Sequence, residues 1–193
     1  MPIVVNRGLN MMFSYTVSLF GHREIDNLIK LEECLTPILR KLIQAKPFVS
    51  FLIGRNGEFD IYTASVIKRM RTELEKSKSD ITLVLPYPVA NLNFYEAYYN
   101  SIVIPETVCG AHPKSAIILR NRWMIDHSDL VIFYVSHKRG GAYAALKYAE
   151  KQSCNCCSLI VDFLQLFKVH QFQDHKFRCH IFVFCTGIFN LIF

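Results

Sequence analysis

The sequence predicts an α/β fold, a Rossmann-like three-layer sandwich with a mostly parallel sheet. Short runs of β-branched and aromatic residues alternate with longer segments of helical apolar spacing, the order expected when helices cover a parallel sheet. Several of the short runs end at glycine, where a strand would turn into the next helix. With 193 residues, 51% of them hydrophobic and 20% charged, the chain resembles an ordinary globular domain with a sizeable core.

The first half of the chain predicts two strand–helix pairs. Residues 16–20 are a short β-rich run, and residues 25–45 carry apolar side chains at helical spacing. Pro47 closes that helix. Residues 48–53 then predict a second buried strand, followed by a helix over about residues 60–76 with basic residues on its outer face.

A long, tyrosine-rich connection follows the third predicted strand. Residues 81–85 form that strand, which Pro86 stops. The connection, residues 87–112, contains a short predicted helix over 94–99 and a short strand over 102–104. A connection of this length in a compact domain is typical of a functional loop or a covering flap.

The last part of the predicted sheet is its most regular. Pro113 suits the first turn of a helix that runs to about residue 128. Residues 130–135 are a continuous apolar run that predicts a buried strand, and residues 142–152 predict the helix after it. Residues 159–161 have the composition of one more strand.

Composition divides the chain into three segments. Residues 1–13 are expected to be an N-terminal extension, residues 14–153 the Rossmann-like domain, and residues 154–193 an atypical hydrophobic tail. The tail holds eight of the fifteen phenylalanines and five of the seven cysteines. A frameshifted or alternatively spliced end would explain this composition, and so would a hydrophobic appendage that packs on a partner.

The sequence favours a cytoplasmic protein without a membrane span or a metal. Residues 1–10 have one charge and no long apolar run, which does not suit an export signal, and the odd cysteine count does not suit a disulfide framework. Charged residues interrupt the tail before any run reaches the roughly 18–20 apolar residues of a span. The tail cysteines lack the paired spacing of a zinc site.

Glycine and basic side chains gather at three strand ends, which share one edge of a parallel sheet. Such loops suit phosphate, because backbone N–H groups at helix N-termini face the anion and arginine adds bidentate hydrogen bonds. Tight turns alone would also explain each glycine, but three such loops at one edge favour a ligand site. The candidate ligand-binding residues are Gly21, His22, Arg23, Gly54, Arg55, Asn56, Gly57, Glu58, Gly140 and Gly141.

Two acids in the loop after the second predicted strand, residues 48–53, have different expected roles. Glu58 is the candidate catalytic residue, because a carboxylate beside a phosphate site can accept ribose hydroxyls or polarise a water. Asp60 could do the same, but we favour it as the N-cap of the following helix. Arg120 and Asn121 matter for the site only if their helix begins near the same edge.

Three segments together resemble the SLOG superfamily, the Rossmann-like group of cytokinin-activating phosphoribohydrolases and DNA-processing proteins. They are residues 17–23, residues 54–60, and the segment from Ala116 through Arg120-Asn121-Arg122 to Gly140-Gly141-Ala142-Tyr143. The resemblance covers about residues 14–152 and is strongest to the small YpsA-like branch. It implies a nucleotide-type ligand held by Gly21, Arg23, Gly54, Glu58, Gly140 and Gly141. The PGGxGTxxE signature of the phosphoribohydrolases, with its catalytic glutamate, is absent from this chain.

These observations lead to three functional hypotheses. The first is a sensor-type module that binds a nucleotide derivative; the second is an N-glycosidic or phosphate-ester hydrolase that uses Glu58, with Arg23 and Arg55 holding phosphate. The third is a DNA-associated protein, but a net charge of +6 without a Lys/Arg block does not favour a nucleic-acid partner. We therefore expect a small-molecule nucleotide ligand, no other cofactor and no membrane partner, and we leave a homo-oligomer open.

Overall fold

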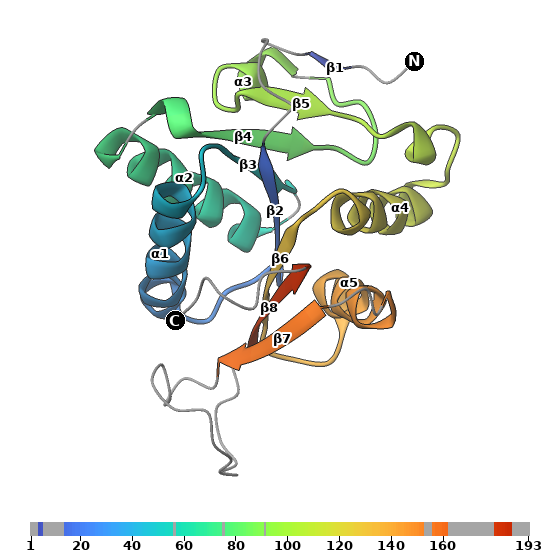
Figure 1. The fold of residues 1–193 in the computed structure, drawn as a ribbon. Helices are drawn as coiled ribbons and strands as arrows, with labels where there is room; N and C mark the ends of the chain where they lie inside the picture. The colour runs from blue at the N-terminus through green and yellow to red at the C-terminus, as the bar shows by residue number, and fades with distance from the viewer. Residues whose placement is uncertain are drawn as a thin grey trace.

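The protein folds as an α/β sandwich around one mixed sheet (Figure 1). The structure, a computed structural model, describes residues 4–5, 14–55, 57–74, 76–90, 92–152, 156–161 and 180–186. The strand order in the sheet is β1-β5-β4-β3-β2-β6-β8-β7, and its five central strands are all parallel. These are β5 (Ser101–Val103), β4 (Ser79–Val84), β3 (Val49–Ile53), β2 (Tyr15–Gly21) and β6 (Leu130–Val135). The predicted Rossmann-like fold is confirmed.

Four helices form the outer two layers. On one face lie α1 (Leu28–Ala45) and α2 (Glu58–Glu73), and on the other lie α4 (Pro113–Asp126) and α5 (Gly140–Lys151) (Figure 1). The connection between β4 and α4 holds the short α3 (Leu92–Glu96), strand β5 and the 3-10 turn η3 (Glu106–Val108), and a second 3-10 turn, η2 (Lys76–Lys78), precedes β4. Each predicted helix and strand of residues 14–152 is therefore present, with boundaries shifted by a few residues.

The strands bury both faces, and their side chains alternate between two cores. In β6, Leu130 and Ile132 pack with the α1 and α2 side of the sheet, whereas Val131 and Phe133 pack with the α4 and α5 side. This alternation follows from the two-residue period of a strand. It also explains the nearly continuous apolar runs in the sequence, because a strand covered by helices on both faces needs apolar side chains at every position.

Local signals set the helix starts. Asn27 caps α1, since its side-chain oxygen accepts a hydrogen bond from the Lys30 backbone N–H at 2.9 Å. Pro113 occupies the first turn of α4, where no intrahelical N–H bond is lost. The predicted start of the first helix at residue 25 is thus three residues early, because Asn27 fixes the boundary.

Antiparallel strands extend the sheet at both edges. Strand β1 (Val4–Val5) pairs with β5, and β8 (His180–Thr186) pairs with β6 and with β7 (Cys156–Val161). Strand β7 includes the predicted strand at residues 159–161, whereas β8 was not predicted. Most of the N-terminal extension and much of the hydrophobic tail lie outside the described residues. None of the described helices combines the length and apolar character that a membrane crossing requires.

The order of the strands creates a switch point between β2 and β6. From β2 the chain builds outward through β3, β4 and β5, and it then crosses to the other side of β2 to form β6. The connections after β2 and β6 therefore leave the sheet toward opposite faces, α1 toward one and α5 toward the other. In open α/β sheets a crevice opens at this point, outside the carboxyl ends of the strands.

Candidate functional site

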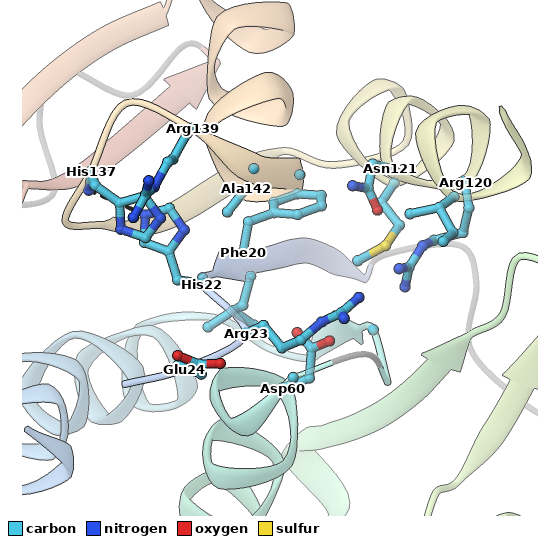
Figure 2. A pocket seen from close by; sticks show the side chains of 18 residues that line it. Phe20, His22, Arg23, Glu24, Asp60, Arg120, Asn121, His137, Arg139 and Ala142 are labelled. Atoms are coloured by element: carbon cyan, nitrogen blue, oxygen red, sulfur yellow. Dashed lines mark hydrogen bonds between the residues drawn. The ribbon is translucent and has the colours of Figure 1, made fainter. Parts of the chain in front are cut away.

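A cavity of about 410 Å³ lies at this switch point (Figure 2). Its walls come from the ends of β2 and β3, the first turn of α2, one face of α4 and the start of α5. Its volume falls within the ~300–1,000 Å³ that small-molecule sites usually span. Part of its lining is apolar and includes Phe20, Ile117 and Met124.

One end of the cavity is the N-terminus of α5. Gly140 has φ +86°, a left-handed conformation that favours glycine, and it opens the helix directly after Arg139. A methyl group at Gly140 or Gly141 would meet no described atom within 4 Å, so the backbone here is open to the cavity. The first N–H groups of a helix have no intrahelical partner. Together with the Arg139 side chain, they offer donors and positive potential to an anion.

Two histidines stack at the same end. The rings of His22 and His137 lie 3.5 Å apart between centroids and are nearly parallel, at 9°. His22 is buried, and its Nε2 accepts a hydrogen bond from the His137 backbone N–H at 3.3 Å. Burial, followed by the neighbouring His137 ring, lowers the pKa of His22, while a hydrogen bond with the His137 backbone and the Asp26 carboxylate partly oppose the shift. These surroundings therefore favour the neutral form of His22.

The opposite wall holds an acid and a buried arginine. Arg120 is only 4% exposed, donates from Nη1 to the Val84 carbonyl at 2.9 Å, and lines the cavity from α4. Burial lowers the pKa of Arg120, and the nearby Asp60 carboxylate opposes that shift. A Cβ atom added at Gly54 would lie 2.5 Å from Arg120 Nη1 and 2.7 Å from Asp60 Oδ2, so both groups close over that glycine. Among the described residues, Arg120 Nε has no hydrogen-bond partner.

Two further glycines allow the loops to approach each other. A Cβ at Gly21 would lie 2.1 Å from Cγ of Phe59, and a Cβ at Gly57 would lie 2.6 Å from the backbone Cα of Arg23. The Glu58 N–H also donates to the Arg23 carbonyl at 2.8 Å. These contacts join the loop after β2 to the start of α2. The glycines at these strand ends therefore set the shape of the cavity rather than only permitting turns.

Seven of the ten predicted ligand residues line the cavity, and three do not. The seven are Gly21, His22, Arg23, Gly54, Gly57, Gly140 and Gly141. Arg55 lies over the Tyr95 ring, 4.9 Å from its centroid, and is not in the lining. Glu58 is exposed, outside the lining, and accepts a hydrogen bond from the Ile25 N–H at 2.9 Å. Asn56 lies outside the described residues.

The expected roles of the two acids need a correction. Asp60 is not the N-cap, because α2 begins at Glu58 and Gly57 occupies the cap position without a side-chain bond. Asp60 instead lines the cavity, whereas Glu58 does not. Two positions along a helix differ by about 200° around its axis, which explains why Glu58 and Asp60 face different surroundings.

The lining also includes residues that the sequence did not single out as ligand residues. They are Leu19, Phe20, Glu24, Asp60, Ile117, Arg120, Asn121, Met124, His137, Arg139 and Ala142. His137 and Arg139 belong to the basic loop after the last parallel strand, so that loop already contained the signal. Arg120 and Asn121 lie in the middle of α4, and the sequence does not show which face of that helix meets the cavity. In Figure 2 they occupy the side opposite His137 and Arg139.

The lining is mainly basic. Three arginines and two histidines surround the cavity, against the two carboxylates of Glu24 and Asp60. Within the part of the chain that the structure describes, no three metal-ligating side chains gather into a cluster. The arrangement therefore suits an anion held by arginine and backbone N–H groups.

No family model matches this chain, and a search of curated proteins finds no match.

Proposed function

We propose that the protein is a binding module for a nucleotide derivative and that the cavity holds the ligand's phosphate at the N-terminus of α5. The observation that carries this proposal is the meeting of an open helix N-terminus, Gly140–Gly141, with Arg139 and Arg23 at the switch point of the sheet. Helix N-termini and arginine are the protein groups best suited to phosphate oxygens. The apolar part of the lining, including Phe20, offers surface to a less polar part of the ligand.

The proposal agrees with the resemblance to the SLOG superfamily, and membership of that superfamily remains a prediction. The position of Glu58 does not favour the hydrolase alternative, because its carboxylate accepts a hydrogen bond from the backbone of Ile25 outside the cavity. Glu24 and Asp60 do line the cavity, but the hydrolase hypothesis depends on Glu58, so the site supports binding better than turnover. We therefore propose binding alone.

A thermal-shift titration of the full chain tests the proposal. The probes are inorganic phosphate, nucleoside 5′-monophosphates, ADP-ribose and NAD. A ligand at about 100 times its Kd stabilises the folded state by about 2.7 kcal/mol. For a chain of this size that corresponds to a Tm increase of roughly 5–11 °C. At least one of these phosphate compounds should produce such a shift.

Matched arginine variants locate the site. Arg139→Ala removes a charged donor from the cavity and should weaken binding about 10- to 100-fold. Arg40→Ala makes the same change in net charge on α1, where Arg40 pairs with Glu73 at 2.9 Å outside the cavity, and should leave the affinity unchanged. Absence of any shift in a folded sample, or equal effects of the two variants, would refute the proposed site.

A further inference from the structure

The cavity has a second polar end, formed by Asp60 and Arg120, which an anion site alone does not require. We propose that the Asp60 carboxylate binds the sugar hydroxyls of a ribonucleoside 5′-phosphate, and that the cavity therefore selects ribose over 2′-deoxyribose. This inference rests on the proposed function, because it takes the phosphate to lie at the N-terminus of α5. Its basis is the position and surroundings of the two side chains.

The Asp60–Arg120 end is built into the fold. Arg120 is 4% exposed, is anchored to the Val84 carbonyl, and still has a buried Nε without a hydrogen-bond partner among the described residues. Asp60 comes from α2, on the other side of the sheet, and its Oδ2 and Arg120 Nη1 both crowd the same face of Gly54. A buried guanidinium costs free energy to desolvate, and a polar ligand group beside it would offset part of that cost.

The charges around Asp60 determine which donors it accepts. An ionised carboxylate accepts up to about four hydrogen bonds, so Asp60 can bind ligand donors in addition to the protein groups that it contacts. Arg23, Arg120 and Arg139 line the same cavity and repel a cationic ligand group. Neutral donors remain, and the hydroxyls of a sugar are the neutral donors closest to a 5′-phosphate. Two adjacent hydroxyls also match the two oxygens of a carboxylate.

The layout in Figure 2 fits a ligand that runs between the two ends. His137 and Arg139 lie on one side of the drawn cavity, Arg120 and Asn121 lie on the other, and Asp60 lies below with Arg23. Phe20 and Ala142 lie between these polar groups. A phosphate at α5 would therefore place the attached sugar over apolar surface, with its hydroxyls toward Asp60. Deoxyribose lacks one of the donors that this arrangement would satisfy.

Isothermal titration calorimetry on the full chain tests the inference with paired probes. The four common ribonucleoside 5′-monophosphates are compared with their 2′-deoxy counterparts and with inorganic phosphate. Loss of one hydrogen bond to a charged group lowers affinity about 10- to 100-fold, so the best ribonucleotide should bind at least about tenfold more tightly than its deoxy form. Equal affinities of the wild-type chain for both forms would overturn the inference while leaving the phosphate site in place.

Two Asp60 variants separate recognition from a purely structural role. Asp60→Asn should bring the ratio of ribonucleotide affinity to deoxyribonucleotide affinity close to one. It should bind inorganic phosphate as tightly as the wild type or more tightly, because the negative charge of Asp60 is removed from the cavity. Asp60→Glu keeps the charge beside Arg120 but displaces the oxygens, so it should fold even if Asp60→Asn does not, and it should also lose the preference. A structural role would change stability and leave the ratio intact, which would contradict the proposal.

The outcomes also separate this inference from the proposed function. Binding of phosphate and of both sugar forms with equal affinity supports the anion site and refutes sugar selection. Binding of phosphate without binding of any nucleotide likewise refutes sugar selection. Failure of every probe to bind refutes the proposed function, and the sugar inference falls with it.

Discussion

Substitution of Gly21 by alanine tests whether the cavity is shaped by close contact between the end of β2 and the start of α2. The added Cβ would lie 2.1 Å from Cγ, 2.2 Å from Cδ2 and 2.7 Å from Cβ of Phe59. Phe59 is 1% exposed, and its ring stacks on Tyr134 with centroids 6.2 Å apart, so it cannot turn into solvent. Either the helix or the strand end must move.

The expected destabilisation follows from this overlap. Overpacking a well-packed core costs about 1–3 kcal/mol. For a domain of this size the Tm should fall by roughly 2–12 °C. The matched control is Gly141→Ala, whose methyl group meets no described atom within 4 Å and which should not lower the Tm. Urea unfolding, monitored by circular dichroism, measures the change in the free energy of unfolding for Gly21→Ala and for Gly141→Ala.

A double-mutant cycle isolates the contact. Phe59→Ala alone should cost about 3–5 kcal/mol, because it empties a fully buried position. In that background Gly21→Ala should cost much less than in the wild type, since the ring it strikes is gone. Equal costs of Gly21→Ala in both backgrounds, or no cost in the wild type, would refute the packing that we describe.

Three further outcomes test other parts of the structure. Because the pKa of His22 is lowered in the folded protein, the unfolded chain takes up a proton more readily than the folded chain. The free energy of unfolding should therefore fall as the pH drops below about 6.5, the ordinary pKa of histidine. His22→Asn should therefore flatten the decline in urea-unfolding free energy between pH 7.5 and 5, and an unchanged slope would count against a buried, neutral histidine. Asn27→Ala should cost about 1 kcal/mol by removing the cap of α1, whereas Asn93→Ala, at an exposed position in α3, should cost almost nothing. Gly141→Ala should hold or raise the Tm but weaken phosphate binding measured by calorimetry, because its methyl group stands at the open backbone of α5; unaltered affinity would place the phosphate elsewhere.

The sequence predicts the fold well because the apolar side chains follow the geometry of buried strands. In residues 130–135 every side chain is buried, and a run of this kind occurs where helices cover both faces of a sheet. Strand β8 lies in a run without Asp, Glu, Lys or Arg (residues 179–193), but it was not predicted, because its partner β6 lies far away in the sequence. Pairing between distant segments leaves no local signal.

The sequence predicts the candidate site only in part. Glycines beside basic residues mark strand ends, so Gly21, Arg23 and Gly140 could be found without coordinates. The role of Asp60 depends on where α2 begins, because the observed cap, Gly57, lies three residues before the expected one and Asp60 therefore belongs to the first turn of the helix. The role of Arg120 depends on which face of α4 meets the sheet, and a charged residue in a helix is ordinarily expected at the surface.

The most direct test of the central claim is a two-dimensional ¹⁵N NMR titration of the full chain with inorganic phosphate and with adenosine 5′-monophosphate. The backbone N–H groups of Gly140, Gly141 and Ala142 form the first turn of α5 at the cavity, and their signals report on an anion there. We expect these signals to shift in a saturable manner and Arg139→Ala to weaken the response. Saturable shifts confined to another part of the protein, with these amide signals unmoved, would contradict a phosphate site at α5.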